Sequence, residues 1–211
     1  MRIAILGTGH MGRTLGTSLI SAGHDVVFGS REPGSATDLP APAVGHTEAI
    51  AASDVVVSAL AADHSLATLT PLGEALADRV LIDIGNAVNQ EMDLIYPDSS
   101  LGERLQRALP NVRVVKTLNT LAGAIGANPT LLPAPTNVFL SGDDAAAKSV
   151  VAGLLTDLGW AASQQIDLGA ITTARAVEHY FLLFAALMGA LHTPMFNLAI
   201  ASAPATQENT P

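Results

Sequence analysis

Short apolar runs, most of them rich in β-branched residues, alternate along the chain with longer stretches rich in alanine and leucine. The runs are apolar throughout, which is typical of parallel strands covered on both faces. Strands are predicted at 2–6, 25–29, 43–45, 54–60, 80–85, 112–116, 137–141 and near 163–167. Helices are predicted at 10–22, 47–52, 65–77, 100–109 and 145–158. This alternation predicts an α/β fold with a doubly wound, mainly parallel sheet.

The pattern changes after Gly169, because residues 170–200 read as mostly helical, with Pro194 placed to break or kink the helix. The longest apolar run, Tyr180–Leu191, has twelve residues, whereas a membrane span needs about 20. We therefore expect no membrane insertion. A core or a dimer interface is expected around Phe181, Leu182, Phe184 and Leu187. The predicted units are a strand–helix domain at 1–168, a helical segment at 169–200 and a disordered tail at 201–211.

A glycine-rich motif, GTGHMG, lies between the first predicted strand and the first predicted helix. In this context G-x-G-x-x-G is typical of dinucleotide binding, the alternative being a structural turn without a ligand. The glycines allow a tight turn, a close approach to a pyrophosphate, and close packing of helix on strand. The motif predicts a Rossmann dinucleotide-binding domain at 1–168 with cofactor contacts from Gly7, Thr8, Gly9, His10, Met11 and Gly12. His10 either faces the cofactor or is an exposed residue of the first helical turn.

The end of the second predicted strand favours NADP over NAD. NAD sites place Asp or Glu there, about 20 residues after the glycines, to bind the ribose 2′-hydroxyl. This chain has Ser30 and Arg31 instead, followed by Glu32. A hydroxyl and a planar, permanently charged guanidinium suit a 2′-phosphate, which a carboxylate would repel. Ser30 and Arg31 are therefore predicted to bind NADP(H), the alternative being a solvated Arg31 paired with Glu32.

Composition and charge exclude several classes of function. The chain has 211 residues, 49% of them hydrophobic and 14% charged, which indicates a folded core. A net charge of −9 argues against a nucleic-acid partner. There is no cysteine, and the six histidines show no metal-ligand spacing, so we predict neither a disulfide nor a metal site. Glycines interrupt the apolar start, no export signal stands out, and we expect a cytoplasmic location.

Groups suited to acid–base chemistry are sparse, and we assign no catalytic residue. The two lysines are Lys116, at the end of a predicted strand, and Lys148, on a predicted helix. Lys116 is either a substrate contact or, as we favour, a flanking charge. Arg175 and Glu178 lie three positions apart on one predicted helix and are expected to pair with each other. Such a site suits direct hydride transfer between two redox cofactors, which carry the chemistry themselves.

Several segments resemble the NADP-dependent oxidoreductases that reduce or oxidise the deazaflavin coenzyme F-420, together with the small NADP-binding reductases around them. The likeness extends over nearly the whole chain. It includes GTGHMG, GSREP, KTLNT at 116–120, SGDD at 141–144 with Lys148, the D-x-G…A-R…E ending at 167–178, and Met195-Phe196-Asn197. The segment Ala61-Ala62-Asp63-His64 lies where archaeal members carry Pro-Trp-Glu-His, so the acid and the histidine are kept and the Pro-Trp is not.

The resemblance implies a homodimer with a deazaflavin stacked on the nicotinamide at the carboxyl edge of the sheet. It implies nicotinamide contacts from Leu60, Ala61, His64, Asn86 and Ala87, and a substrate side formed by Asn119, Thr120 and Leu121. The expected activity is NADP(H)-dependent hydride transfer with coenzyme F-420 as co-substrate, and relatives of this shape also use a flavin or a ferric complex. The alternative from another class is a non-catalytic NADP-binding redox sensor.

Overall fold

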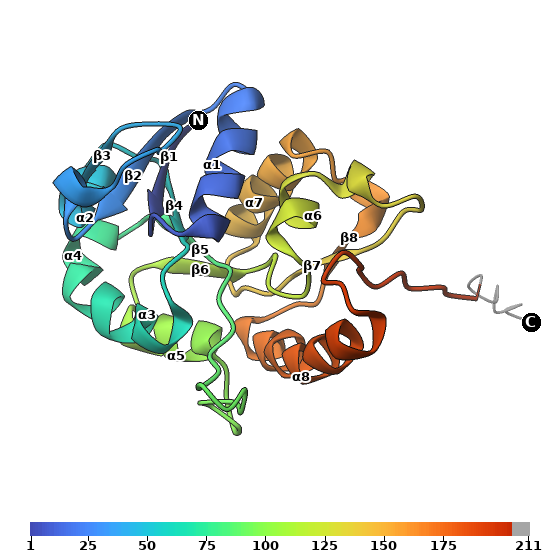
Figure 1. Ribbon diagram of the computed structural model, residues 1–211. Helices are drawn as coiled ribbons and strands as arrows, with labels where there is room; N and C mark the ends of the chain where they lie inside the picture. Colours follow the sequence, from blue (N-terminus) through green and yellow to red (C-terminus); the bar gives the residue numbers. More distant parts are fainter. Residues whose placement is uncertain (204–211) are drawn as a thin grey trace, which may run out of the picture.

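A six-stranded parallel sheet forms the centre of the protein, with the strand order β3-β2-β1-β4-β5-β6 (Figure 1). The computed structural model describes residues 1–203, so residues 204–211 of the predicted tail lie outside the described residues. The strands are β1 Arg2–Leu6, β2 Asp25–Ser30, β3 Ala43–Gly45, β4 Val55–Ser58, β5 Val80–Asp83 and β6 Arg113–Lys116. The order reverses between β1 and β4, which confirms the predicted doubly wound α/β fold.

Helices cover both faces of the sheet (Figure 1). They are α1 His10–Ser21, α2 His46–Ala51, α3 Ala62–Leu69, α4 Gly73–Leu76, α5 Leu101–Ala108, α6 Gly123–Ala127, α7 Ala145–Asp157 and α8 Ala174–Leu191. Short 3-10 turns are η1 Pro33–Ser35, η2 Thr70–Leu72, η3 Pro129–Leu131, η4 Ala162–Gln164 and η5 Ile171–Thr173. Successive strand residues point to opposite faces, so Ile3 and Ile5 pack with α1, α6 and α7. Ala4 and Leu6 pack with the helices of the other face, α2 to α5.

A second, two-stranded parallel sheet extends this centre. It consists of β7 Val138–Leu140 and β8 Gln165–Asp167. An antiparallel bridge joins it to the end of β6, because the backbone N–H groups of Lys116 and Ser141 donate to each other's carbonyls at 2.8 and 3.0 Å. The fully buried Trp160 donates its indole N–H to the carbonyl of Gly126 at 3.0 Å. The small sheet and α6 are thereby fixed against the main sheet.

The predicted helix at 170–200 is correct only in its first two thirds. Helix α8 ends at Leu191 because His192 has a left-handed backbone with φ of 55°, and Pro194 follows two residues later. Residues 192–200 are not helical; they return to the small sheet, where the N–H of Asn137 donates to the carbonyl of Leu198 at 2.8 Å.

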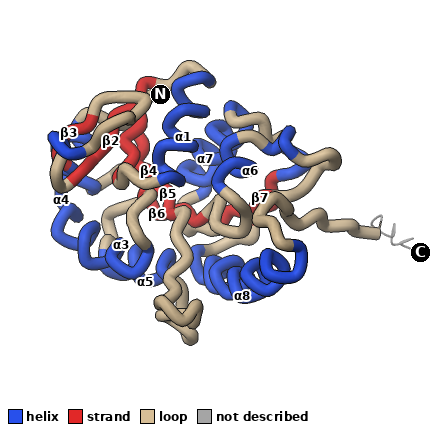
Figure 2. The backbone as a smooth tube through the Cα atoms, viewed as in Figure 1, coloured by secondary structure: helices blue, strands red, loops and turns tan. Residues whose placement is uncertain are grey.

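Other differences from the sequence prediction lie in segments of weak pattern. The expected helix at 65–77 is divided into α3, η2 and α4, with Pro71 at the start of η2. The short α6 was not predicted, since its sequence GAIGA has too little apolar periodicity to indicate a helix. Between β5 and α5, residues 84–100 form a long loop that extends away from the sheet (Figure 2).

Helix α8 lies against the carboxyl edge of the sheet by its first turns and exposes apolar side chains beyond them. Ala174, Val177 and Glu178 are buried, whereas Leu182, Leu183 and Leu191 are 47, 52 and 53% exposed. The 21 residues Ile171–Leu191 are long and apolar enough to cross a membrane by length and composition alone. Helices in the cores of other proteins meet the same criterion, so the expectation of no membrane insertion stays a prediction.

Candidate nucleotide-binding site

The carboxyl ends of β1, β2 and β4 surround a cavity of about 360 Å³. It lies where the strand order of the sheet reverses, which is where open α/β sheets bind their ligands. Seven residues predicted to contact the cofactor line it: Gly7, Thr8, Gly9, Ser30, Arg31, Leu60 and Ala61. The remaining lining residues are Gly29, Glu32, Ser35, His46 and Ala59.

The three glycines of the GTGHMG loop meet different constraints. Gly7 has φ of +116°, and a Cβ there would lie 2.4 Å from the carbonyl oxygen of Ala59. A Cβ on Gly12 would lie 2.4 Å from the carbonyl oxygen of Gly7. Gly9 lines the cavity, yet a Cβ on it would meet no protein atom within 4 Å. Gly7 and Gly12 are therefore required by packing, whereas the absence of a side chain at Gly9 leaves space inside the cavity.

This space fits a pyrophosphate. Gly9 precedes α1 as its N-cap and offers no side-chain cap, so the first N–H groups of the helix remain available and the positive end of its dipole faces the cavity. The guanidinium of Arg13 donates to the carbonyls of Thr8 at 2.8 Å and Asp38 at 3.0 Å. Arg13 thus joins the glycine loop to the segment after β2, a role that no local sequence signal revealed.

The end of β2 presents the residues predicted to select NADP. The hydroxyl of Ser30 accepts a hydrogen bond from the N–H of Glu32 at 3.1 Å. The side chain of Arg31 is exposed and lines the cavity. Within residues 1–203, Arg31 forms no ion pair, so the expected alternative of an Arg31–Glu32 pair is wrong. Arg31 is available to an anionic ligand.

The other predicted cofactor and substrate residues lie outside this cavity. His10 is exposed and Met11 half-buried in the first turn of α1. His64 lies on α3, 3.6 Å from Asp63, with its side chain 75% exposed. Asn86 and Asn119 are joined by two hydrogen bonds. The side-chain amide of Asn86 donates to the backbone carbonyl of Asn119 at 2.7 Å, and the side-chain amide of Asn119 donates to the side-chain oxygen of Asn86 at 2.9 Å. Asn119 is buried, as are Ala87, Thr120 and Leu121.

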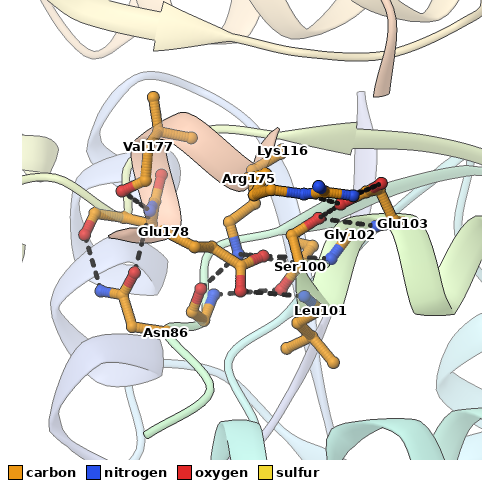
Figure 3. A network of polar contacts seen from close by, with 12 residues as sticks. Asn86, Ser100, Leu101, Gly102, Glu103, Lys116, Arg175, Val177 and Glu178 are labelled. Atoms are coloured by element: carbon orange, nitrogen blue, oxygen red, sulfur yellow. Dashed lines mark hydrogen bonds and ion pairs between the residues drawn. The ribbon is translucent and has the colours of Figure 1, made fainter. Parts of the chain in front are cut away.

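Lys116 is not the flanking charge that the sequence suggested. Its side chain is fully buried at the carboxyl end of β6, and its ammonium lies 2.9 Å from both Asp83 and Glu178 and also donates to the carbonyl of Gly85 (Figure 3). Burial alone would lower the pKa of Lys116. The charges of Asp83 and Glu178 and their hydrogen bonds outweigh burial and raise this pKa, so the ammonium stays charged.

Arg175 and Glu178 do not pair with each other. Glu178 accepts from the N–H groups of Leu101 at 2.8 Å and Gly102 at 3.1 Å, at the start of α5, in addition to Lys116. Arg175 binds Glu103 of α5 at 3.0 Å (Figure 3). The two residues therefore join α8 to α5 and β6. The side-chain amide of Asn119 also donates a hydrogen bond to the carbonyl of Val177 on α8 at 2.9 Å.

Comparison with known proteins identifies related reductases. The family described as "NADP oxidoreductase coenzyme F420-dependent" matches residues 2–87. The F420-dependent NADP reductase of Methanocaldococcus jannaschii is 26% identical over 200 residues, covering 84% of this chain and 88% of that protein. Metalloreductase STEAP3 of Rattus norvegicus is 30% identical over 181 residues, 84% of this chain, but the chain spans only 36% of its length.

A crystal structure of a candidate F420-dependent NADP reductase from Arthrobacter sp. FB24 is similar over nearly the whole fold. It is 38% identical with a TM-score of 0.91, covering 96% of this chain and all of that one. This agreement in sequence and structure confirms the resemblance inferred from the GTGHMG and GSREP segments. The chain belongs to the family of coenzyme F-420-dependent NADP oxidoreductases.

Proposed function

We propose that this NADP-dependent oxidoreductase transfers a hydride directly between the nicotinamide of NADP(H) and the deazaflavin coenzyme F-420. The observation that carries the cofactor half is the cavity at the end of β2, where the exposed Arg31 lies beside Ser30. Support for the acceptor comes from relatives. Similarity to F420-dependent NADP reductases extends over most of both chains, whereas similarity to the metalloreductases covers about a third of their length.

The residues present fit NADP(H). Gly9 and the first N–H groups of α1 would hold the pyrophosphate, and Ser30 and Arg31 would bind the 2′-phosphate. Leu60 and Ala61, which follow β4, also line the cavity. When bound, NADPH supplies a hydride from C4 of its nicotinamide, so the protein has to provide position rather than a nucleophile. We propose that the hydrogen-bonded pair Asn86 and Asn119 shapes the edge on which the acceptor stacks.

Turnover with defined acceptors tests this proposal. We expect the purified protein to oxidise NADPH when coenzyme F-420 is added, as followed by the absorbance of both compounds, and to do so much more slowly with NADH. Turnover with free flavin or ferric chelate, but not with the deazaflavin, would replace the proposed acceptor; the likeness to STEAP3 makes the ferric chelate the first alternative to test. Tight NADPH binding without turnover across the panel would favour the redox sensor.

Replacing Arg31 by alanine is expected to lower the affinity for NADPH by about ten- to a hundredfold, because a charge-assisted hydrogen bond is worth about 1.5–3 kcal/mol. The affinity for NADH should not change, since NADH lacks the 2′-phosphate. Fluorescence titration with both cofactors measures the two constants. The matched control is Arg2→Ala, which removes an exposed arginine paired with Asp54 at the opposite edge of the sheet. An unchanged NADPH affinity in Arg31→Ala would contradict the assigned role.

The apolar face of α8 is proposed to bind a second copy of this chain, as the family resemblance implies. Its exposed leucines, Leu182, Leu183 and Leu191, form a patch of the kind that monomers avoid. Sedimentation analysis should show a dimer, and Leu183→Glu should shift it toward monomer without loss of secondary structure. A wild-type monomer at high concentration would contradict the prediction.

A cytoplasmic location likewise stays a prediction, which cell fractionation would test.

A further inference from the structure

His46 is a wall residue of the cavity that no sequence pattern singled out. It begins α2, directly after Gly45, and Gly45 lies beside Ser30 in the register of β3 with β2. Parallel strands end at the same edge of a sheet, so Ser30 and His46 emerge at that edge side by side. Both line the cavity together with Arg31. The sheet itself therefore places an imidazole next to the predicted 2′-phosphate contacts.

The ring of His46 packs over the backbone of β2. Its Cδ2 atom would lie 3.2 Å from a Cβ placed on Gly29, which lies beside Ser30. A larger residue at position 29 would meet the side chain of Leu6 at 2.4 Å and would also crowd this ring. The packing leaves the ring only half-buried, so it is held by the protein and is open to the cavity.

The surroundings of His46 favour its neutral form when the cavity holds no anion. Burial, and then the charge of Arg31, lower its pKa below the ordinary value of 6.5. The other charged residues on or next to the neighbouring elements are Arg2 on β1, Asp25 on β2, Glu32 after β2, Glu48 on α2 itself and Glu74 on α4. Among the described residues, none of these carboxylates pairs with His46. A dianionic ligand beside Arg31 would reverse this balance, because a nearby negative charge favours the protonated ring.

We infer that His46 is a third recognition residue for the 2′-phosphate of NADP(H), and that its ring takes up a proton from solvent when the cofactor binds. This inference rests on the proposed function, since it requires the 2′-phosphate to lie at the end of β2. Protonation converts the ring into a charged donor beside Ser30 and Arg31. NADPH then binds more tightly as the pH falls through the pKa of the ring in the complex. NADH, without the 2′-phosphate, shows no such gain.

The pH dependence of the phosphate itself acts in the opposite direction, because its second pKa is near 6 and its monoanion binds basic groups less well. A comparison of wild type with His46→Asn at each pH removes this effect, since both proteins bind the same phosphate. We expect His46→Asn to lower NADPH affinity about tenfold at pH 6 and about two- to threefold at pH 8.5, with NADH affinity unchanged. His192→Asn, at the end of α8, is the matched control.

Two measurements on folded protein complete the test. Calorimetric titration with NADPH in buffers of different ionisation enthalpy should show proton uptake by wild type at pH 7, and less by His46→Asn. In wild type alone, NMR titration should show one imidazole whose pKa rises when NADP⁺ is added, which keeps the test valid if the variant fails to fold.

The outcomes separate the two proposals. One outcome is that wild type prefers NADPH to NADH while His46→Asn shows the same pH profile and the same proton uptake as wild type. In that case the role of His46 is overturned and the proposed function stands. If wild type binds both cofactors equally, both proposals fail. A pH-dependent loss of NADPH affinity, confined to His46→Asn and absent with NADH, supports the inference.

Discussion

Gly9→Ala is expected to abolish NADPH binding at micromolar cofactor while leaving the fold intact. Gly9 has φ of −77° and ψ of −176°, a conformation that alanine adopts without strain. The added methyl group would meet no protein atom within 4 Å, so stability should change little. It would stand in the cavity, where the pyrophosphate must approach the backbone. Thermal unfolding and fluorescence titration together separate a binding defect from a folding defect.

Two other glycines provide matched controls for Gly9→Ala. Gly7→Ala should destabilise the protein, because the new Cβ would lie 2.4 Å from the carbonyl of Ala59 and φ is +116°. Gly153→Ala, in α7, likewise adds a methyl group that meets nothing within 4 Å. It should stabilise the helix by about 0.5–1 kcal/mol and leave binding unchanged. Wild-type NADPH affinity in Gly9→Ala would contradict the placement of the pyrophosphate.

The second large effect is expected from Lys116→Met, which should lower the free energy of unfolding by about 3–5 kcal/mol. The substitution keeps most of the side-chain volume but leaves Asp83 and Glu178 buried without their shared cation. Domains are commonly stable by about 5–15 kcal/mol, so this loss is a large fraction of the total. Denaturant unfolding followed by circular dichroism measures it.

The other lysine is the control for Lys116→Met. Lys148 pairs with Asp167 at 2.8 Å, with side chains that are 14 and 55% exposed respectively. Asp167 stays solvated when the lysine is replaced, so Lys148→Met should cost about 1 kcal/mol. The double variant Lys116→Met with Glu178→Gln removes one buried carboxylate charge and should recover part of the loss. Equal effects of the two lysine substitutions would contradict the structural role of the buried network.

The raised pKa of Lys116 also fixes the direction of a pH effect. A group whose pKa is higher in the folded state stabilises the fold fully below its unfolded-state pKa, which for lysine is about 10.4. Its contribution is therefore constant through the neutral range. It is lost only as the pH rises above that value and through the raised pKa of the folded protein.

Local patterns were enough to predict the sheet and the glycine loop. The GTGHMG segment folds as predicted because neighbouring residues specify its strand, its turn and the start of its helix. Ser30 and Arg31 could be located in the same way, because they lie where the next strand ends. The half of the cavity formed by the ends of β1 and β2 could thus be identified from the sequence. Contacts beyond it were inferred from resemblance, and all contacts with the coenzyme stay predictions.

Contacts between distant segments could not be predicted in the same way. Spacing along one helix suggested an Arg175–Glu178 pair, yet each residue is drawn to a partner on another element, Glu103 and Lys116 respectively. His46 was missed for the same reason, because only the pairing of β3 with β2 brings it beside Ser30. Sequence spacing describes neighbours on one element, whereas tertiary packing decides which charges meet.

The position of Glu178 has a consequence for the order in which parts of the protein fold during synthesis. It lies 77 residues after Leu101 and accepts a hydrogen bond from the N–H group of that residue. At about 5–20 residues per second, a ribosome needs roughly 4 to 15 seconds to synthesise that interval. Until Glu178 is made, the ammonium of Lys116 lacks one of its two carboxylate partners, and the N–H groups of Leu101 and Gly102 lack their acceptor. We therefore expect the nascent chain to form β1 to β5 early and to close the carboxyl edge of its sheet only after α8 has been synthesised.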